Sequence, residues 1–172
     1  MKRMPKFVYL ASQSPRRRQL LEQLGVAYEL LLPDDSEDAE ALEVVLPNEA
    51  PRAYVQRVTQ LKLDAALARM KKRQLPTAPV LCSDTTVALG KTILGKPESN
   101  QDAQRMLRTL SGQTHRVLTA VALGTPRQRE QALSISSVRF ADMTTAQIKS
   151  YADSGEPMGK AGAYAVQGRA AA

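Results

Sequence analysis

The sequence predicts an α/β protein built on an elongated, mixed and twisted sheet with flanking helices. Short apolar runs typical of buried strands alternate with helical segments in the first half of the chain, and two longer strand-like segments follow. No apolar stretch is long enough to cross a membrane. With 172 residues, 43% of them hydrophobic, the chain can form one domain with its own core, and its single cysteine excludes an internal disulfide.

The predicted strands are apolar runs bounded by turn residues. They lie at 7–11, 27–33, 78–84, 115–123 and 132–140, with a hairpin around Gly90–Lys91. The last block, EPMGKAGAYAVQG, is rich in glycine and then apolar, so we expect a loop that leads into a strand.

The predicted helices follow from capping residues and helical spacing. They run from Pro15 to Leu24, from Pro51 to about Arg73, from Asn100 to Leu110, and over the segment TTAQIKSYADSG. Ser14 stands at the N-cap of the first helix, which Gly25 ends, and Asn100 can cap the third.

Charge is spread unevenly along the chain. The net charge of +7 and the pI of about 9.8 favour an anionic partner. The basic cluster Arg16–Arg18 contrasts with the acidic block DDSEDAEALE at 34–43, and both can also be solvated surface. A nucleic-acid-binding module is an alternative, but no aromatic stacking motif accompanies the basic residues, so we expect neither a nucleic-acid nor a membrane partner.

Polar side chains follow two of the predicted strands, where ligands of open α/β sheets collect. These side chains are Ser12, Ser14, Arg16 and Arg17 after the first strand, and Asp84 and Thr85 after the third. Arginines in the first turn of a helix oppose its dipole, so a polyphosphate would compensate them. A solvated first turn is the alternative.

Further candidates are charged residues in distinctive positions. Asp84 can accept a proton from water or hold a divalent cation, although a turn aspartate is equally open. Lys96, fixed between a glycine and a proline, suits a phosphate contact, and Glu37 is a candidate second metal carboxylate or a surface residue. Lys62, in mid-helix, reads as a solvated lysine. We expect His115 at the surface, at the start of a strand.

Four blocks stand in order along the chain: LASQSPRRRQLL, SDTTVALGKTILGKP, RMLRTLSGQTHRVLTAVAL and EPMGKAGAYAVQG. In this arrangement the sequence resembles the Maf family of nucleoside triphosphate pyrophosphatases over nearly its whole length. The resemblance implies a fold akin to inosine triphosphate pyrophosphatase (Maf/Ham1), with two lobes around a cleft. It implies one Maf-like domain over 1–172 that lacks the usual C-terminal closing segment.

The resemblance also implies an activity and the residues that carry it. A nucleoside triphosphate is hydrolysed to the monophosphate and pyrophosphate with a divalent cation, Mg²⁺ or Mn²⁺. Asp84 matches the proton acceptor for the attacking water, and Glu37 joins it at the metal. The phosphate contacts are Ser12, Arg17, Lys62 and Lys96, to which Ser14 is added from its place after the first strand.

Three positions imply the substrate. Arg16, Thr85 and Gln167 match the branch that resembles dTTP/UTP pyrophosphatases. The amide of Gln167 offers a donor and an acceptor to a pyrimidine, and the small Thr85 leaves room beside the ring. We expect a cytoplasmic, house-cleaning enzyme for pyrimidine nucleotides, including modified ones, and the resemblance allows a homodimer. The alternative function is a non-catalytic regulator of septum formation that binds nucleotide.

Overall fold

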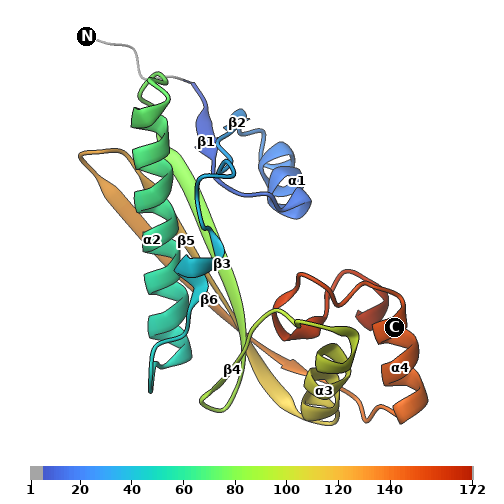
Figure 1. The fold of residues 1–172 in the computed structure, drawn as a ribbon. Coiled ribbons are helices and arrows are strands. Elements are labelled where there is room, and N and C mark those ends of the chain that lie inside the picture. The colour runs from blue at the N-terminus through green and yellow to red at the C-terminus, as the bar shows by residue number, and fades with distance from the viewer. Residues whose placement is uncertain (1–5, 172) are drawn as a thin grey trace. The chain divides into compact units, whose positions relative to one another are not determined.

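The computed structural model describes residues 6–171 and has the predicted mixed α/β fold (Figure 1). The strands are β1 (Val8–Leu10), β2 (Tyr28–Leu30), β3 (Val80–Leu89), β4 (Thr92–Leu94), β5 (Thr114–Gly124) and β6 (Arg129–Arg139). The helices are α1 (Pro15–Gln23), α2 (Pro51–Lys72), α3 (Asn100–Leu110) and α4 (Thr145–Asp153), with 3₁₀ turns η1 (Glu40–Glu43), η2 (Ala161–Ala163) and η3 (Arg169–Ala171). The strand order is β2-β1-β3-β5-β6, and β4 pairs with β3.

The chain divides into two compact units. The first comprises the described residues up to Glu49, then Ala53–Asp84 and Ala120–Leu133. The second comprises Ala50–Arg52, Thr85–Thr119 and the described residues from Ser134 onward. Strand β3 therefore contributes its first half to one unit and its second half to the other.

In the first unit, the long helix α2 covers a sheet whose strands β1, β2 and β3 pair in parallel. Strand β1 pairs in parallel with β2 and β3, so that Leu10 lies between Leu30 and Leu81. Leu63, Ala66 and Met70 recur at helical spacing on α2 and are buried against the sheet. The core also contains Tyr9, Leu31, Ala78, Val80, Cys82 and Ala122. Burial raises the pKa of the Cys82 thiol to about 12, so this side chain is an inert core residue.

The second unit has a separate core beneath α3, whose buried face is formed by Ala103, Met106, Leu107 and Leu110. The prediction that His115 lies at the surface is wrong, because its side chain is only 1% exposed. Its Nε2 atom lies 2.6 Å from the Tyr164 hydroxyl, and its ring packs edge-on against Phe140. Burial lowers the pKa of His115.

Three local predictions also need correction. Strand β3 continues to Leu89, so Asp84 lies in the middle of a strand and not at its carboxyl end. The last described segment, up to residue 171, forms the turns η2 and η3 where we expected a strand. The N-cap of α3 is Ser99, whose hydroxyl accepts a hydrogen bond from the Asp102 amide, and not Asn100. Within residues 6–171, no helix combines the length and apolarity that a bilayer crossing requires.

Candidate active site

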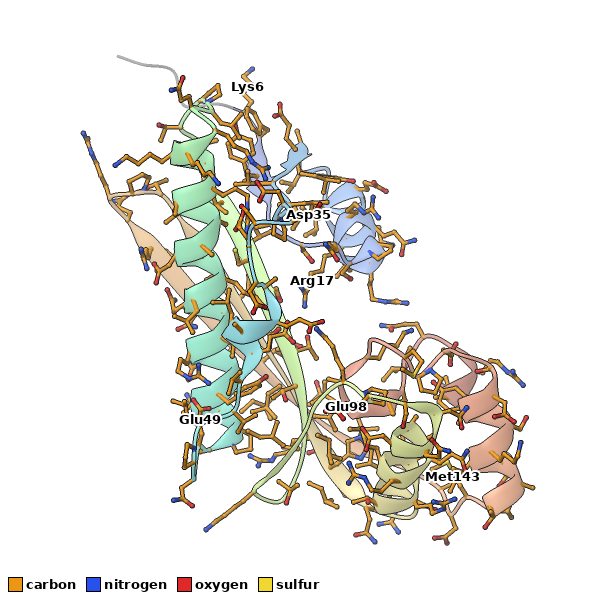
Figure 2. The ribbon with its side chains drawn as sticks, viewed as in Figure 1. Lys6, Arg17, Asp35, Glu49, Glu98 and Met143 are labelled. Atoms are coloured by element: carbon orange, nitrogen blue, oxygen red, sulfur yellow. The ribbon has the colours of Figure 1, made fainter. Side chains whose placement is uncertain are left out.

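The first part of the candidate site is the loop that joins β1 to α1. Ser12 is buried, and its Oγ accepts hydrogen bonds from the Ser14 amide at 3.2 Å and from Arg17 Nη1 at 3.0 Å. Ser14 occupies the N-cap position of α1, as predicted. Within the described residues, its side chain makes no capping hydrogen bond. Ser12 thus organises the loop, and Figure 2 shows Arg17 extending from the first turn of α1.

The first turn of α1 is strongly basic. It holds Arg16, Arg17 and Arg18 and, in the described structure, no acidic residue. Because the dipole also places positive charge at this end of the helix, the turn favours an anion. Burial lowers the pKa of Arg17, an effect that the nearby Asp84 and Glu43 carboxylates oppose.

The second part is a lysine held between two carboxylates. Lys62 Nζ donates to Asp84 Oδ1 at 2.6 Å and to Glu43 Oε1 at 2.8 Å. Burial alone would lower the pKa of Lys62, but the charge of Asp84, reinforced by Glu43, raises it above its ordinary value. Asp84 reaches this position because β3 runs past the end of β1, whose last register partner on β3 is Leu81.

The acidic block of the sequence belongs to a segment, residues 34–49, that lies along α2 (Figure 1). We call residues 34–49 the acidic segment. Four ion pairs connect the segment in reverse order to α2 and to Arg73 directly after it: Asp34 with Arg73, Glu37 with Arg69, Glu43 with Lys62, and Glu49 with Arg57. The segment and the helix therefore run antiparallel. Basic residues of the same unit therefore pair with Asp34, Glu37, Glu43 and Glu49, whereas Asp35, Asp38 and Glu40 are exposed.

Helix α2 also fixes the backbone at Glu43. The Tyr54 hydroxyl donates to the Glu43 carbonyl at 2.9 Å, and Arg57 Nη2 donates to the Val44 carbonyl at 2.8 Å. Arg57 in turn forms two bonds with the carboxylate of Glu49, which Figure 2 labels at the end of the segment. Burial raises the pKa of Tyr54 to about 12, so its hydroxyl remains a donor at neutral pH.

Sequence reasoning missed Glu43. It is one of several acids in the block at 34–43, and no local pattern distinguishes it from its neighbours. The residue predicted instead, Glu37, accepts two hydrogen bonds from Arg69, at 2.8 and 2.6 Å. Arg69 lowers the pKa of Glu37, and the same guanidinium binds the Leu31 carbonyl. The metal role of Glu37 stays a prediction.

The structure brings together Ser12, Ser14, Arg17, Lys62 and Asp84, with Arg16 in the same helical turn. Of the remaining predicted residues, Glu37 lies in the first unit, bound to Arg69, and Thr85, Lys96 and Gln167 belong to the second unit. There, Thr85 Oγ1 lies 2.9 Å from Thr119 Oγ1, Lys96 is exposed after β4, and Gln167 is exposed in a turn closed by the Gly168 amide on the Ala165 carbonyl. Their roles in binding the nucleotide stay predictions.

The donor set suits a hard divalent cation only in part. Within residues 6–171, no group of three or more His, Cys, Asp or Glu side chains could hold a metal. However, Asp84 and Glu43 both contact Lys62 Nζ, so their carboxylates lie close enough for one cation to touch both. Mg²⁺ in nucleotide sites commonly takes one or two carboxylates and completes its shell with phosphate and water oxygens. The residues present fit such a cation.

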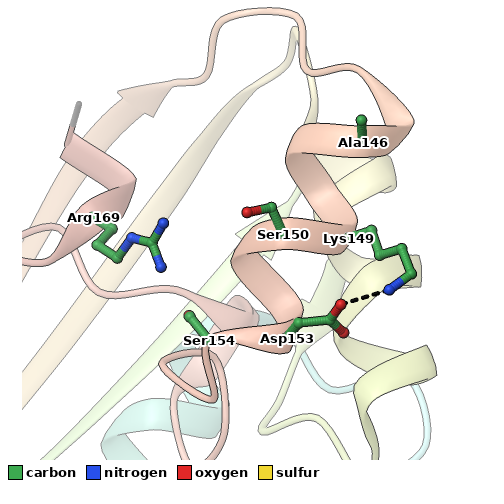
Figure 3. A pocket seen from close by; sticks show the side chains of 6 residues that line it. All are labelled: Ala146, Lys149, Ser150, Asp153, Ser154 and Arg169. Atoms are coloured by element: carbon green, nitrogen blue, oxygen red, sulfur yellow. Dashed lines mark hydrogen bonds and ion pairs between the residues drawn. The ribbon is translucent and has the colours of Figure 1, made fainter.

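A surface pocket of the second unit lies on α4 beside Arg169 (Figure 3). Its charged residues include Lys149 and Asp153, which form an exposed pair at 2.6 Å one turn apart on the helix. The lining contains none of the predicted site residues, and an exposed pair of this kind is common on helices. We assign no function to this pocket.

Known proteins are similar to this chain in sequence and in fold. The family model described as "Maf-like protein" matches residues 7–172. The dTTP/UTP pyrophosphatase of Albidiferax ferrireducens is 73% identical over 169 residues, which are 98% of this chain and 84% of the relative. Relatives of the same name from Polaromonas sp. and Cupriavidus metallidurans are 70% and 61% identical over 96% and 98% of this chain, or 82% and 84% of their own lengths.

One solved structure, that of the Staphylococcus aureus Ham1 protein, matches with a TM-score of 0.52 at 13% identity, over 80% of this chain and 73% of that one. Fold and site thus define an α/β protein of the Ham1 type with a basic, carboxylate-containing centre suited to an anionic ligand. The chain belongs to the Maf family, as the sequence motifs predicted.

Proposed function

We propose that the protein hydrolyses dTTP and UTP to the monophosphate and pyrophosphate. The observation that carries the proposal is the placement of Asp84 against Lys62 and near Arg17, in a chain 73% identical to a protein named dTTP/UTP pyrophosphatase. A triphosphate needs cationic partners, and a carboxylate beside them can act on water. Both requirements are met within one unit.

The proposed reaction is attack of water on the α-phosphorus. The water oxygen forms a bond to the α-phosphorus, while the bond from this atom to the bridging oxygen of the pyrophosphate breaks. Asp84 orients the water and accepts its proton. Arg17 and Lys62 bind phosphate oxygens and offset their negative charge, which grows on the leaving group as the bond breaks.

A divalent cation, Mg²⁺ or Mn²⁺, would be held by Asp84 and Glu43 and would supply charge neutralisation at the phosphates. The chain's own residues then have separate tasks. Ser12 keeps Arg17 directed across the β1–α1 loop, and the Tyr54 hydroxyl keeps the Glu43 backbone in place. Lys96 would add a further phosphate contact.

Selection of the base is assigned to Arg16, Thr85 and Gln167. An amide such as that of Gln167 pairs with the adjacent carbonyl and imide N–H of uracil or thymine, whereas cytosine offers a different pattern. Related modified pyrimidine nucleotides fit the same requirement. Since its substrates are nucleotides of the cell's pool, we place the enzyme in the cytoplasm. We propose that the protein has no nucleic-acid partner. A homodimer is compatible with the proposed function, and the oligomeric state is to be measured.

The test is a panel of nucleoside triphosphates, each incubated with the purified protein and Mg²⁺ or Mn²⁺, with pyrophosphate and monophosphate both quantified. We expect pyrophosphate from dTTP and UTP in excess of that from purine nucleotides and CTP. Release of orthophosphate without pyrophosphate would show attack at a different phosphorus and overturn the proposal. Nucleotide binding without any hydrolysis would overturn it in favour of a binding-only role.

A further inference from the structure

Lys62 differs from the other basic residues that α2 presents to the acidic segment. Arg57 and Arg69 each bind one carboxylate with two bonds and also bind a backbone carbonyl, Val44 for the former and Leu31 for the latter. Such planar, multiply bonded guanidiniums are fixed. Lys62 instead makes single contacts to two different carboxylates through a flexible four-carbon stem.

The position of the Lys62 ammonium is that of a cation bridging two acids. Its Nζ atom lies 2.6 Å from Asp84 Oδ1 and 2.8 Å from Glu43 Oε1. A divalent cation between the same oxygens needs metal–oxygen distances of about 2.1 Å for Mg²⁺, so each carboxylate would move inward by only about half an ångström. The ammonium and the metal ion cannot occupy this position together.

We propose that Lys62 is a tethered counter-ion that holds the metal position between Asp84 and Glu43 and yields it to a divalent cation. The inference rests on the proposed function, because the cation concerned is the one used with the nucleotide. Lys62 keeps the two carboxylates from repelling each other when no metal is bound. When it leaves them, its ammonium is available to the phosphates that arrive with the metal.

Exposure of the three side chains is compatible with such an exchange. The Lys62 side chain is 21% exposed, that of Glu43 24% and that of Asp84 11%. Water and ions therefore reach the group, and Lys62 can move without first opening the core. Arg17 stays on α1, bonded to Ser12, and supplies a fixed positive charge during the exchange.

The experiment is a titration of the nucleotide-free protein with Mn²⁺ alone, followed by electron paramagnetic resonance. Wild type is compared with Lys62→Met and with Lys71→Met, which removes the same charge from an exposed site on the same helix. We expect Lys62→Met to bind Mn²⁺ about tenfold more tightly or better, because a competing charge has gone. We expect Lys71→Met to match wild type, and Glu43→Gln added to Lys62→Met to remove the gain.

Equal Mn²⁺ affinity in wild type and Lys62→Met would overturn the proposal, as would an equal gain in Lys71→Met. Because no nucleotide is present and no turnover is measured, this result is independent of whether dTTP and UTP are the substrates. Far-UV circular dichroism first establishes that Lys62→Met is folded. If this variant is not folded, the rate at which Lys62 is acetylated in wild type is measured instead, by mass spectrometry. Mn²⁺ should raise this rate, because it displaces the ammonium from the carboxylates. An unchanged rate would overturn the proposal.

Discussion

Replacement of Asp84 by asparagine tests the centre of the proposed mechanism. The amide keeps the size of the carboxylate and can still accept a hydrogen bond from Lys62, but it cannot take a proton from water. Loss of a general base typically slows a reaction by about 10²–10⁴-fold, which corresponds to about 3–5 kcal/mol of barrier. We expect a fall in kcat of that size.

The same substitution should affect stability much less than activity. Lys62 retains its 2.8 Å bond to Glu43, and both side chains are partly exposed, so no isolated buried charge is created. Weakening one charged hydrogen bond costs about 1–2 kcal/mol. For a chain of this size, that cost lowers Tm by about 2–8 °C.

The assay measures pyrophosphate release from dTTP and UTP at saturating substrate, together with a thermal melt and a binding isotherm for the nucleotide. Asp64→Asn is the matched control, because Asp64 lies on α2 in an exposed pair with Arg129 and should leave turnover unchanged. If Asp84→Asn keeps more than about a tenth of wild-type kcat while folded, Asp84 is not the proton acceptor.

Two further substitutions test the attachment of the acidic segment to α2. Tyr54→Phe removes the hydroxyl that donates to the Glu43 carbonyl. We expect the free energy of unfolding, measured in urea, to fall by about 1 kcal/mol, and kcat to fall severalfold. An unchanged kcat would show that this hydrogen bond does not position Glu43. Glu37→Gln removes a carboxyl whose pKa Arg69 holds below its ordinary 4.5. Wild type should therefore be the more stable protein above pH 4.5, and the difference should shrink as the pH falls through the lowered pKa; a difference that persists unchanged to about pH 3 would exclude an ionic origin.

Much of the fold could be predicted because local patterns and tertiary structure agree. The helix from Pro51 shows helical spacing of its apolar residues, and the strands are apolar runs bounded by turn residues. Apart from β3, these elements lie within a few residues of their predicted bounds. The extent of β3 could not be predicted, because Asp84 and the threonines after it read as a polar end. In the structure Asp84 and Thr86 are buried, Thr85 is partly buried, and β3 pairs with β4 and β5 as well as with β1.

Long-range contacts explain the other differences. His115 reads as a surface residue because a lone histidine at a strand start carries no sign of its distant partners Phe140 and Tyr164. For a related reason, the sequence could not show that Glu43, and not Glu37, lies beside Lys62. Which acid meets Lys62 and which meets Arg69 depends on how the acidic segment lies against α2, and no residue within either segment encodes that register by itself.

The attachment of the acidic segment to α2 has a consequence for how sequence length can change here. Arg57 lies in α2 and Arg73 directly follows it, still bonded through its amide to the Arg69 carbonyl. At the helical rise of about 1.5 Å per residue, the two are about 24 Å apart. The stretch from Asp34 to Glu49 could reach about 50 Å if fully extended. The chain between Asp34 and Glu49 is thus longer than the distance that it must span. Insertions or deletions between neighbouring ion pairs should therefore change only the loop between them, and each acidic residue should keep its basic partner.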